Sequence, residues 1–305
     1  MTADLEARFR AGERAALARV LTLVENDPNV HETWIGKLPP IGRAKVVGIT
    51  GPPGGGKSSL VNRMISAYRQ RDRSVAVLAF DPSSRLTGGA ALGDRVRMME
   101  TWDDDKVYVR SLASRGRLGG LSDAVFGALR VLEAYGVDVI LIETVGVGQG
   151  EIDIADIADV TVLIQVPGTG DTVQLIKAGV LEVADILVVN KADLPGAERL
   201  YRDLSSLVHE VDPKPGAASV VKTSAAENQG IDELICQIEG RIASKAEGMK
   251  ARRAAAELRH LVLSRAERRV NRQLRSPEGV ALIDAVARGE LHPQEAIERL
   301  GSWGS

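Results

Sequence analysis

The sequence has a single cysteine, few aromatic side chains and little net charge. Cys236 is the one cysteine among 305 residues, so no disulfide can form within the chain, which fits a reducing compartment. It lies in the apolar pattern of Ile231, Leu234 and Ile235, which predicts a buried position on a helix. Aromatic residues make up 3% of the chain and the formal net charge is -2, so neither base stacking nor general electrostatic attraction predicts a nucleic-acid partner.

Long apolar runs are also missing. Runs such as 139–142 and 160–164 are far shorter than the roughly 18 to 20 residues that span a bilayer. The first twenty residues carry acids and bases close to the start, so they do not have the pattern of a secretory signal. We therefore expect a cytoplasmic protein with no membrane partner.

Strand and helix patterns alternate along most of the chain. Residues 2–26 have apolar side chains at helical spacing and predict one or two amphipathic helices. Short Val-, Ile- and Leu-rich segments follow, as is typical of strands buried on both faces of a parallel sheet. The predicted strands are 45–50, 75–80, 107–110, 137–142, 160–166, 186–189 and 219–221. Helical segments separate most of them, which predicts an α/β fold with a doubly wound, mostly parallel sheet.

The strand pattern stops after about residue 240. Residues 249–275 are predicted to form one long helix, and Ser276 with Pro277 to open another, which Gly289 ends. The sequence thus predicts an N-terminal helical segment (1–43), an α/β domain (44–246) and a C-terminal helical segment (247–305). The last segment has apolar stripes but too little bulk for a domain of its own, so it should pack on a neighbour.

The loop after the first predicted strand matches the phosphate-binding pattern G-x-x-x-x-G-K-[ST] and leads into a helix. Glycines allow backbone N–H groups to approach phosphate oxygens, and the helix N-terminus adds partial positive charge. Lys57 is expected to reach the β and γ phosphates, and Ser58 to ligate Mg²⁺. An incidental glycine-rich turn is the alternative, but the strand–loop–helix context favours phosphate binding. The predicted phosphate-binding residues are Gly51, Pro52, Pro53, Gly54, Gly55, Gly56, Lys57, Ser58 and Ser59.

Three carboxylates follow strands that should end near this loop. Asp81 closes the second predicted strand, Asp94 lies in the next loop, and Glu143 follows the fourth strand. We predict that they take part in catalysis and, with Ser58, hold Mg²⁺ directly or through water. Each alone would also suit a helix cap or a surface ion pair. Gln149 either positions the attacking water or is an exposed residue of its loop.

Residues 190–193 match the pattern N-K-x-D at the end of a strand. The carboxylate of Asp193 can accept hydrogen bonds from N1–H and the exocyclic amine of guanine, which adenine does not offer. Asn190 and Lys191 complete the motif, and the Lys191 stem can lie over the base. Ser224 and Ala225 follow the next strand and suit a loop whose backbone contacts the guanine oxygen. The sequence therefore predicts that GTP and GDP, rather than adenine nucleotides, are bound.

Four glycine-rich stretches resemble the MeaB/ArgK family: DPSSRLTGG, SRGRLGG, ETVGVGQGE and PGTGDTVQLIKAG. The resemblance extends over roughly residues 1–300 and implies a GTPase chaperone of adenosylcobalamin-dependent acyl-CoA mutases, such as methylmalonyl-CoA or 2-hydroxyisobutyryl-CoA mutase. Such a chaperone gates cofactor loading and protects or reactivates the mutase, which in turn stimulates slow GTP hydrolysis. The resemblance also implies a homodimer joined largely through C-terminal helices. Nothing in the sequence requires that this chain itself bind cobalamin.

The same resemblance assigns three nucleotide-responsive segments. Switch I falls around residues 81–94 and switch II around 143–151, and a third switch falls on Asp171, Gln174 and Lys177. Gly150 is a departure, because members of the family usually have serine at that position.

Two other classes of GTPase share part of this pattern. A metallochaperone for a nickel or cobalt enzyme should carry a cluster of cysteine and histidine, whereas the four histidines here are scattered. A nucleic-acid-binding regulatory GTPase is suggested by residues 250–275, where nine basic residues meet only Glu257 and Glu267. We favour an amphipathic helix face or a dimer arm as the explanation of that stretch, so a nucleic-acid partner is not expected.

Overall fold

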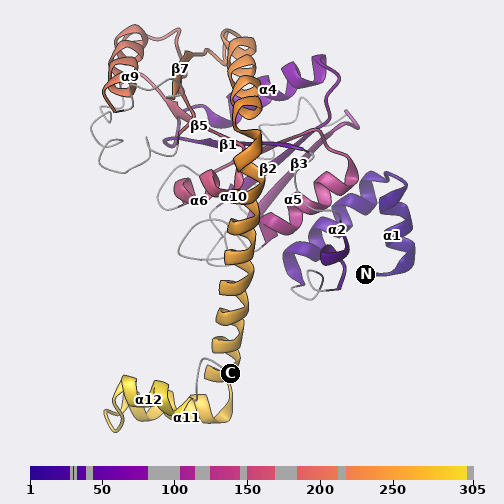
Figure 1. Ribbon diagram of the computed structural model, residues 1–305, viewed down its shortest axis with the longest axis vertical. Coiled ribbons are helices and arrows are strands. Elements are labelled where there is room, and N and C mark those ends of the chain that lie inside the picture. Colours follow the sequence, from indigo (N-terminus) through magenta and orange to yellow (C-terminus); the bar gives the residue numbers. More distant parts are fainter. Residues whose placement is uncertain are drawn as a thin grey trace. The chain divides into compact units, whose positions relative to one another are not determined.

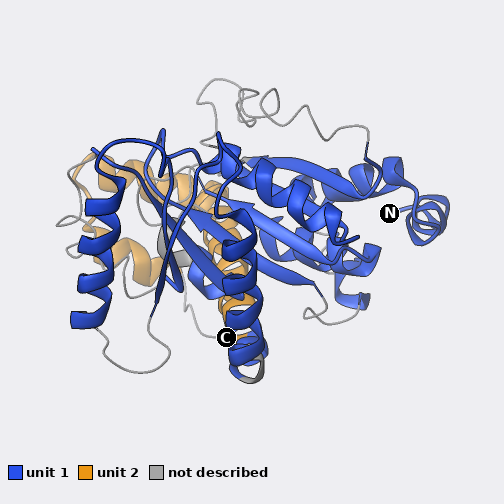
Figure 2. Ribbon diagram, turned by 90° about the horizontal axis from the view of Figure 1, so that it is seen from above, with its two compact units in different colours: residues 1–254 blue, residues 255–305 orange. Residues whose placement is uncertain are grey.

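The computed structural model describes residues 1–27, 30, 33–38, 44–81, 104–113, 124–144, 150–168, 184–211 and 218–300 (Figure 1). The chain divides into two compact units, Met1–Ala254 and Ala255–Ser305 (Figure 2). Among the residues described, no helix combines the length and the apolar character needed to cross a membrane.

A single sheet of parallel strands forms the centre of the first unit. Its order is β3-β2-β4-β1-β5-β6-β7. Every residue of β4, β5 and β6 is buried, as their continuous apolar sequences predict for a sheet covered on both faces. The seven predicted strands are confirmed, with ends that shift by at most three residues. Their bounds are β1 Lys45–Thr50, β2 Val75–Asp81, β3 Val107–Ala113, β4 Val139–Glu143, β5 Val160–Gln165, β6 Ile186–Val189 and β7 Ser219–Lys222.

Helices cover both faces of this sheet. One face packs against α4 and the start of α10, where Leu60 and Ile235 share a core cluster with Val47. The other face carries α5, α6 and α9, as right-handed crossovers between these strands require (Figure 1). The predicted doubly wound α/β fold is therefore confirmed. The helices are α4 Lys57–Gln70, α5 Ala124–Tyr135, α6 Gly150–Ile157, α9 Ala197–Val211 and α10 Ile231–Leu274.

The N-terminal helices α1 (Ala3–Arg10) and α2 (Arg14–Asn26) confirm the amphipathic pattern predicted for residues 2–26. The α2 helix packs against α5. The ring of Phe9 lies 5.4 Å from that of Trp34 and 5.7 Å from that of Tyr135, so aromatic contacts fix the α1 end against α5. The 3₁₀ helix η1 (Ile35–Lys37) follows Trp34.

The α6 helix approaches β1 very closely at Gly48. A β-carbon on Gly48 would lie 2.7 Å from the side chain of Ile154 and 3.1 Å from that of Ala158. Any larger residue would force the Ile154 side chain or the helix to shift, and Gly48 lies just before the predicted phosphate-binding loop. The helix that follows the ETVGVGQ sequence is therefore packed directly on the strand that precedes that loop.

Aspartates repeat at the amino edge of the sheet, each one residue before a strand. Asp138 accepts hydrogen bonds from the Ser74 backbone N–H and hydroxyl, both at 2.8 Å. Asp159 accepts from the N–H of Val46 at 2.7 Å, and Asp185 from the N–H of Thr161 at 2.9 Å. Each carboxylate thus satisfies an N–H group at the start of the neighbouring strand.

The α10 helix runs past this amino edge and binds Asp185 through Lys245 and Asp159 through Arg253. Lys245 pairs with Asp185, and Lys45 at the start of β1 pairs with Glu239. The predicted helix 249–275 therefore begins much earlier, at Ile231. Gly240 and Gly248 lower helix propensity, but the packing and ion pairs of the folded chain outweigh that local cost.

Arg253 of α10 is almost fully buried, with 4% of its side chain exposed. Its Nε donates to the carbonyl of Ile157 at 2.9 Å, and its Nη2 lies 2.5 Å from Asp159. Its Nη1 lies 3.4 Å from Glu133, which is also buried. The neighbouring Arg252 donates to the Ala158 carbonyl at 3.1 Å. Of the nine basic residues in 250–275, Arg253 is thus bound inside the protein, and Arg252, although exposed, is bound to a backbone carbonyl of the first unit.

The prediction that Cys236 is buried was wrong. The cysteine is exposed, because the buried stripe of α10 is formed by Ile231, Leu234, Ile235 and Ile238. At about 100° per residue, position 236 lies beyond the edge of that stripe.

The second unit contains the end of α10 and the helices α11 (Pro277–Ala287) and α12 (Pro293–Arg299). The Ser276 hydroxyl accepts from the Gly279 N–H at 3.1 Å, which confirms the predicted cap. Gly289 has φ 73° just after α11, which confirms the predicted end of that helix.

The carboxyl group of Asp138 should make the stability of the fold depend on pH in the acid range. Burial raises the pKa of its carboxyl. The hydrogen bonds from Ser74 and the positive charge of Arg73 together lower this pKa by more, so it lies below its ordinary value. A carboxylate with a depressed folded-state pKa stabilises the fold above its unfolded pKa of about 3.9, and this contribution disappears as the pH falls through the folded pKa.

We expect Asp138→Asn to lower stability at neutral pH and to flatten the loss of stability below about pH 4. Urea unfolding followed by circular dichroism from pH 7 to pH 2.5 measures both effects. Asp105→Asn is the matched control, because the Asp105 side chain is 99% exposed. A pH profile of Asp138→Asn that parallels the wild type would contradict this role.

Candidate functional site

The candidate phosphate-binding loop connects β1 to α4 in a strained backbone conformation. Gly51 has φ 144° and Gly56 has φ 82°, values that favour glycine. A β-carbon at Gly51 would lie 2.5 Å from the Ile164 carbonyl oxygen, and one at Gly56 would lie 2.5 Å from Asn190 Nδ2. Both glycines are therefore required by close contacts as well as by backbone geometry.

Lys57 and Ser58 open α4 at the carboxyl edge of the sheet. The Lys57 ammonium group is buried and donates to the carbonyls of Gly51 at 2.9 Å and Pro52 at 3.0 Å. The Ser58 hydroxyl donates to Glu143 Oε1 at 2.7 Å. Glu143 is the buried last residue of β4, which pairs with β1. The structure thus brings together a cation, a hydroxyl and a carboxylate predicted from distant parts of the sequence.

Asp81 ends β2 at the same edge of the sheet. Ala79 pairs with Glu143 in the register of β2 and β4, so the backbone of Asp81 lies two residues further along the neighbouring strand. Five other predicted site residues fall outside the described residues. They are Asp94, Gln149, Asp171, Gln174 and Lys177.

Asn190 connects the predicted base-binding motif to the phosphate loop. Its Nδ2 donates to the Gly55 carbonyl at 2.9 Å, and its Oδ1 accepts from the Thr223 hydroxyl at 3.1 Å. Asn190 and Thr223 are each 1% exposed. One buried amide therefore joins the loops that follow β1, β6 and β7.

Asp193 is oriented by the loop after β7. The Ser224 hydroxyl donates to Asp193 Oδ1 at 2.6 Å. Ser224 and Gln229 exchange backbone hydrogen bonds, so the intervening turn is closed. Sequence reasoning placed Thr223 and Ser224 in a base-contacting loop but missed that the Ser224 hydroxyl orients Asp193 and that the Thr223 hydroxyl bonds Asn190. A hydroxyl residue directly after a strand that neighbours the N-K-x-D strand is the signal for both.

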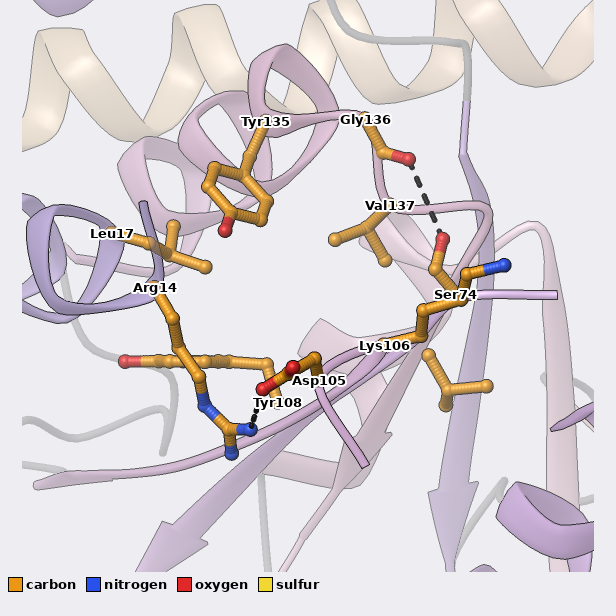
Figure 3. Close-up of a pocket in the computed structure, with 10 residues that line it drawn as sticks. Arg14, Leu17, Ser74, Asp105, Lys106, Tyr108, Tyr135, Gly136 and Val137 are labelled. Carbon is orange, nitrogen blue, oxygen red and sulfur yellow. Dashed lines mark hydrogen bonds and ion pairs between the residues drawn. The ribbon is translucent and has the colours of Figure 1, made fainter. Parts of the chain in front are cut away.

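A separate cavity of about 110 Å³ lies at the opposite edge of the sheet. Figure 3 shows Arg14, Tyr108 and Tyr135 around it. It borders the amino ends of β2, β3 and β4, whereas the phosphate loop follows the carboxyl end of β1. The cavity is therefore not part of the candidate nucleotide site.

The chain is similar to known GTPases. The family model described as methylmalonyl Co-A mutase-associated GTPase MeaB matches residues 17–278. A protein of Pyrococcus abyssi named as a GTPase is 42% identical over 98% of this chain and 96% of its own length. The mouse protein named methylmalonic aciduria type A homolog, mitochondrial, is 34% identical over 73% of this chain and 59% of its own. The crystal structure of an LAO/AO transport system kinase is 27% identical and has a TM-score of 0.69, covering 98% of this chain and 95% of the other.

We expect Asp193→Asn to weaken the affinity for GTP by about 100-fold, because an amide cannot accept both hydrogen bonds from guanine. The same change should favour xanthosine triphosphate, whose C2 oxygen can accept from the amide. Calorimetric titration with GTP, ATP and xanthosine triphosphate measures these preferences. An unchanged order of affinities would remove Asp193 from base recognition.

Proposed function

The chain belongs to the MeaB family of methylmalonyl-CoA mutase-associated GTPases, and from that membership we propose that it gates adenosylcobalamin loading into a partner acyl-CoA mutase. It binds guanine nucleotides and hydrolyses GTP. The observation that carries the proposal is the match of the family model over residues 17–278. It is accompanied by a phosphate loop that is hydrogen-bonded, at the carboxyl ends of the strands, to the carboxylate of Glu143 and to Asn190 of the guanine motif.

In the proposed site the phosphate chain lies against the loop 51–56, and Lys57 neutralises charge on the β and γ phosphates. Its ammonium group already lies at the loop, held by two carbonyls that it can exchange for phosphate oxygens. Hydrolysis proceeds by in-line attack of water, and the backbone N–H groups of the loop stabilise the charge that develops on the γ-phosphate. Gln149 is proposed to position the water.

The hydroxyl of Ser58 and the carboxylate of Glu143 fit a magnesium site. Both are hard oxygen donors, and they lie 2.7 Å apart beside the phosphate loop. Asp81 and Asp94 are proposed to complete the site, directly or through water. When bound, Mg²⁺ would offset negative charge on the β and γ phosphates.

The proposed partner is an adenosylcobalamin-dependent mutase of the methylmalonyl-CoA or 2-hydroxyisobutyryl-CoA type. The family description names the first of these, and the mouse relative is named methylmalonic aciduria type A homolog. Residues around 81–94 and 143–151, with Asp171, Gln174 and Lys177, are proposed to respond to the nucleotide and to convey its state to the mutase.

Purified protein should hydrolyse GTP at least about tenfold faster when its mutase is added, because the partner completes an arrangement that the free GTPase leaves slow. Phosphate release with each of the two mutases measures this effect. Lys57→Ala is the control and should lose turnover with or without the mutase. If neither mutase raises the rate or forms a complex, the chaperone role fails, whereas basal turnover still identifies a GTPase.

We also propose that the chain forms a homodimer through its C-terminal helices. Large apolar side chains are exposed on the described part of these helices, and such groups are costly to leave in water. They include Leu258, Val262 and Leu263 of α10, Val280 and Ile283 of α11, and Ile297 of α12.

Val262→Arg should weaken dimerisation at least about tenfold, because it would place a charge in an apolar interface. Analytical ultracentrifugation over a range of concentrations measures the association. Asn271→Arg adds the same side chain at an exposed polar position of α10 and should leave the dimer intact. A monomeric wild-type protein would contradict the proposal.

A further inference from the structure

One arginine of α4 holds the loop that follows β7. Arg63 Nε donates to the carbonyl oxygen of Ala225 at 2.8 Å, across 162 residues of sequence. The arginine is half-buried and Ala225 is 8% exposed, so this hydrogen bond is partly shielded from water. Neither the phosphate-loop pattern nor the N-K-x-D pattern includes Arg63.

Arg63 lies on the same helix as Lys57 of the predicted phosphate site, so its contact links that site to the loop after β7. Lys57 is the first residue of that helix, and Arg63 follows six residues later, less than two turns away. Leu60 and Met64 bury the same helix against the sheet, which fixes its orientation. One rigid helix therefore carries the lysine of the phosphate site and a donor to the base-binding loop.

The rest of the loop is held on both sides of Ala225. Ser224 bonds Asp193 and Gln229, and Gly230 lies so close to the Lys222 carbonyl that a β-carbon would come within 2.0 Å of it. Ala225 has its carbonyl engaged by Arg63, while its N–H has no backbone acceptor within the described part of the chain. The hydrogen bonds that close the loop therefore do not use the Ala225 N–H.

We propose that Arg63 is a positioning residue for guanine recognition: by holding the Ala225 carbonyl, it aims the Ala225 N–H at the O6 atom of the base. The inference rests on the proposed guanine site and adds a determinant to it. Asp193 reads N1–H and the 2-amino group, and the Ala225 N–H reads O6, the neighbouring atom on the same edge of the base. Adenine carries an amino group at this position, which cannot accept that hydrogen bond.

Two substitutions separate the hydrogen bond from the packing of the side chain. Glutamine places its Nε2 the same number of bonds from the backbone as the arginine Nε, so Arg63→Gln keeps a donor without the charge. Methionine places a methyl group there, so Arg63→Met keeps the stem and removes the donor. Arg69→Met is the control on the same helix, because Arg69 Nε bonds Asp104 at 2.7 Å rather than the base loop.

The readout is the affinity for three nucleotides, measured by isothermal titration calorimetry. 6-Thio-GDP replaces O6 by sulfur, a weaker acceptor, and inosine diphosphate lacks only the 2-amino group. Arg63→Met should bind GDP about tenfold more weakly than the wild type, while its affinity for 6-thio-GDP changes by less than about threefold. The ratio of GDP to inosine diphosphate affinity should stay the same, because Asp193 determines it.

Arg63→Gln should restore GDP affinity to within about threefold of the wild type, and Arg69→Met should leave all three affinities unchanged. An equal loss for GDP and 6-thio-GDP in Arg63→Met, or a loss that glutamine does not restore, would show that Arg63 only supports the fold and would overturn the proposal. Failure of the guanine site itself has a different signature, since wild-type protein would then bind GDP no better than ADP.

Discussion

The candidate nucleotide site depends on one buried amide, that of Asn190. Its nitrogen donates to the phosphate loop and its oxygen accepts from Thr223, so the loops after β1, β6 and β7 have one relative position. The contact is possible only because Gly56 has no side chain, since a β-carbon would come within 2.5 Å of the Asn190 nitrogen. If either partner moved away, the buried amide would be left without a hydrogen bond at a cost in free energy. The guanine motif and the phosphate loop therefore stabilise each other's positions.

Features encoded by neighbouring residues could be predicted from the sequence. Continuous apolar segments identified all seven strands, and the phosphate and base motifs were placed at the correct strand ends, because each pattern is local. Contacts between distant residues were missed: nothing near Arg63 or Arg253 in the sequence indicates a partner in the loop after β7 or beside β5. The helical pattern around Cys236 and the helix 249–275 were both predicted, but their continuity in α10 was missed because the intervening glycines weaken the local helical pattern. The predicted residues of the three switch segments that lie outside the described ranges stay predictions.

The basic stretch of α10 illustrates how composition can mislead. Nine basic residues in 26 positions suggest an anionic partner, yet Arg253 is buried between two carboxylates and Arg252 binds backbone carbonyls. Buried ion pairs of this kind are stable only when their remaining hydrogen-bonding groups are satisfied, and Arg253 also binds the Ile157 carbonyl. Part of the positive charge in this stretch therefore holds α10 to the sheet rather than facing a partner.

The aspartates before β5 and β6 each serve two neighbours at once. One oxygen of each closes the beginning of an adjacent strand, and the other receives a basic side chain from α10. The same two carboxylates therefore hold α10 and close the sheet, at the end of the strands furthest from the candidate nucleotide site. A substitution of either aspartate should therefore loosen the start of one strand and release α10 at the same time.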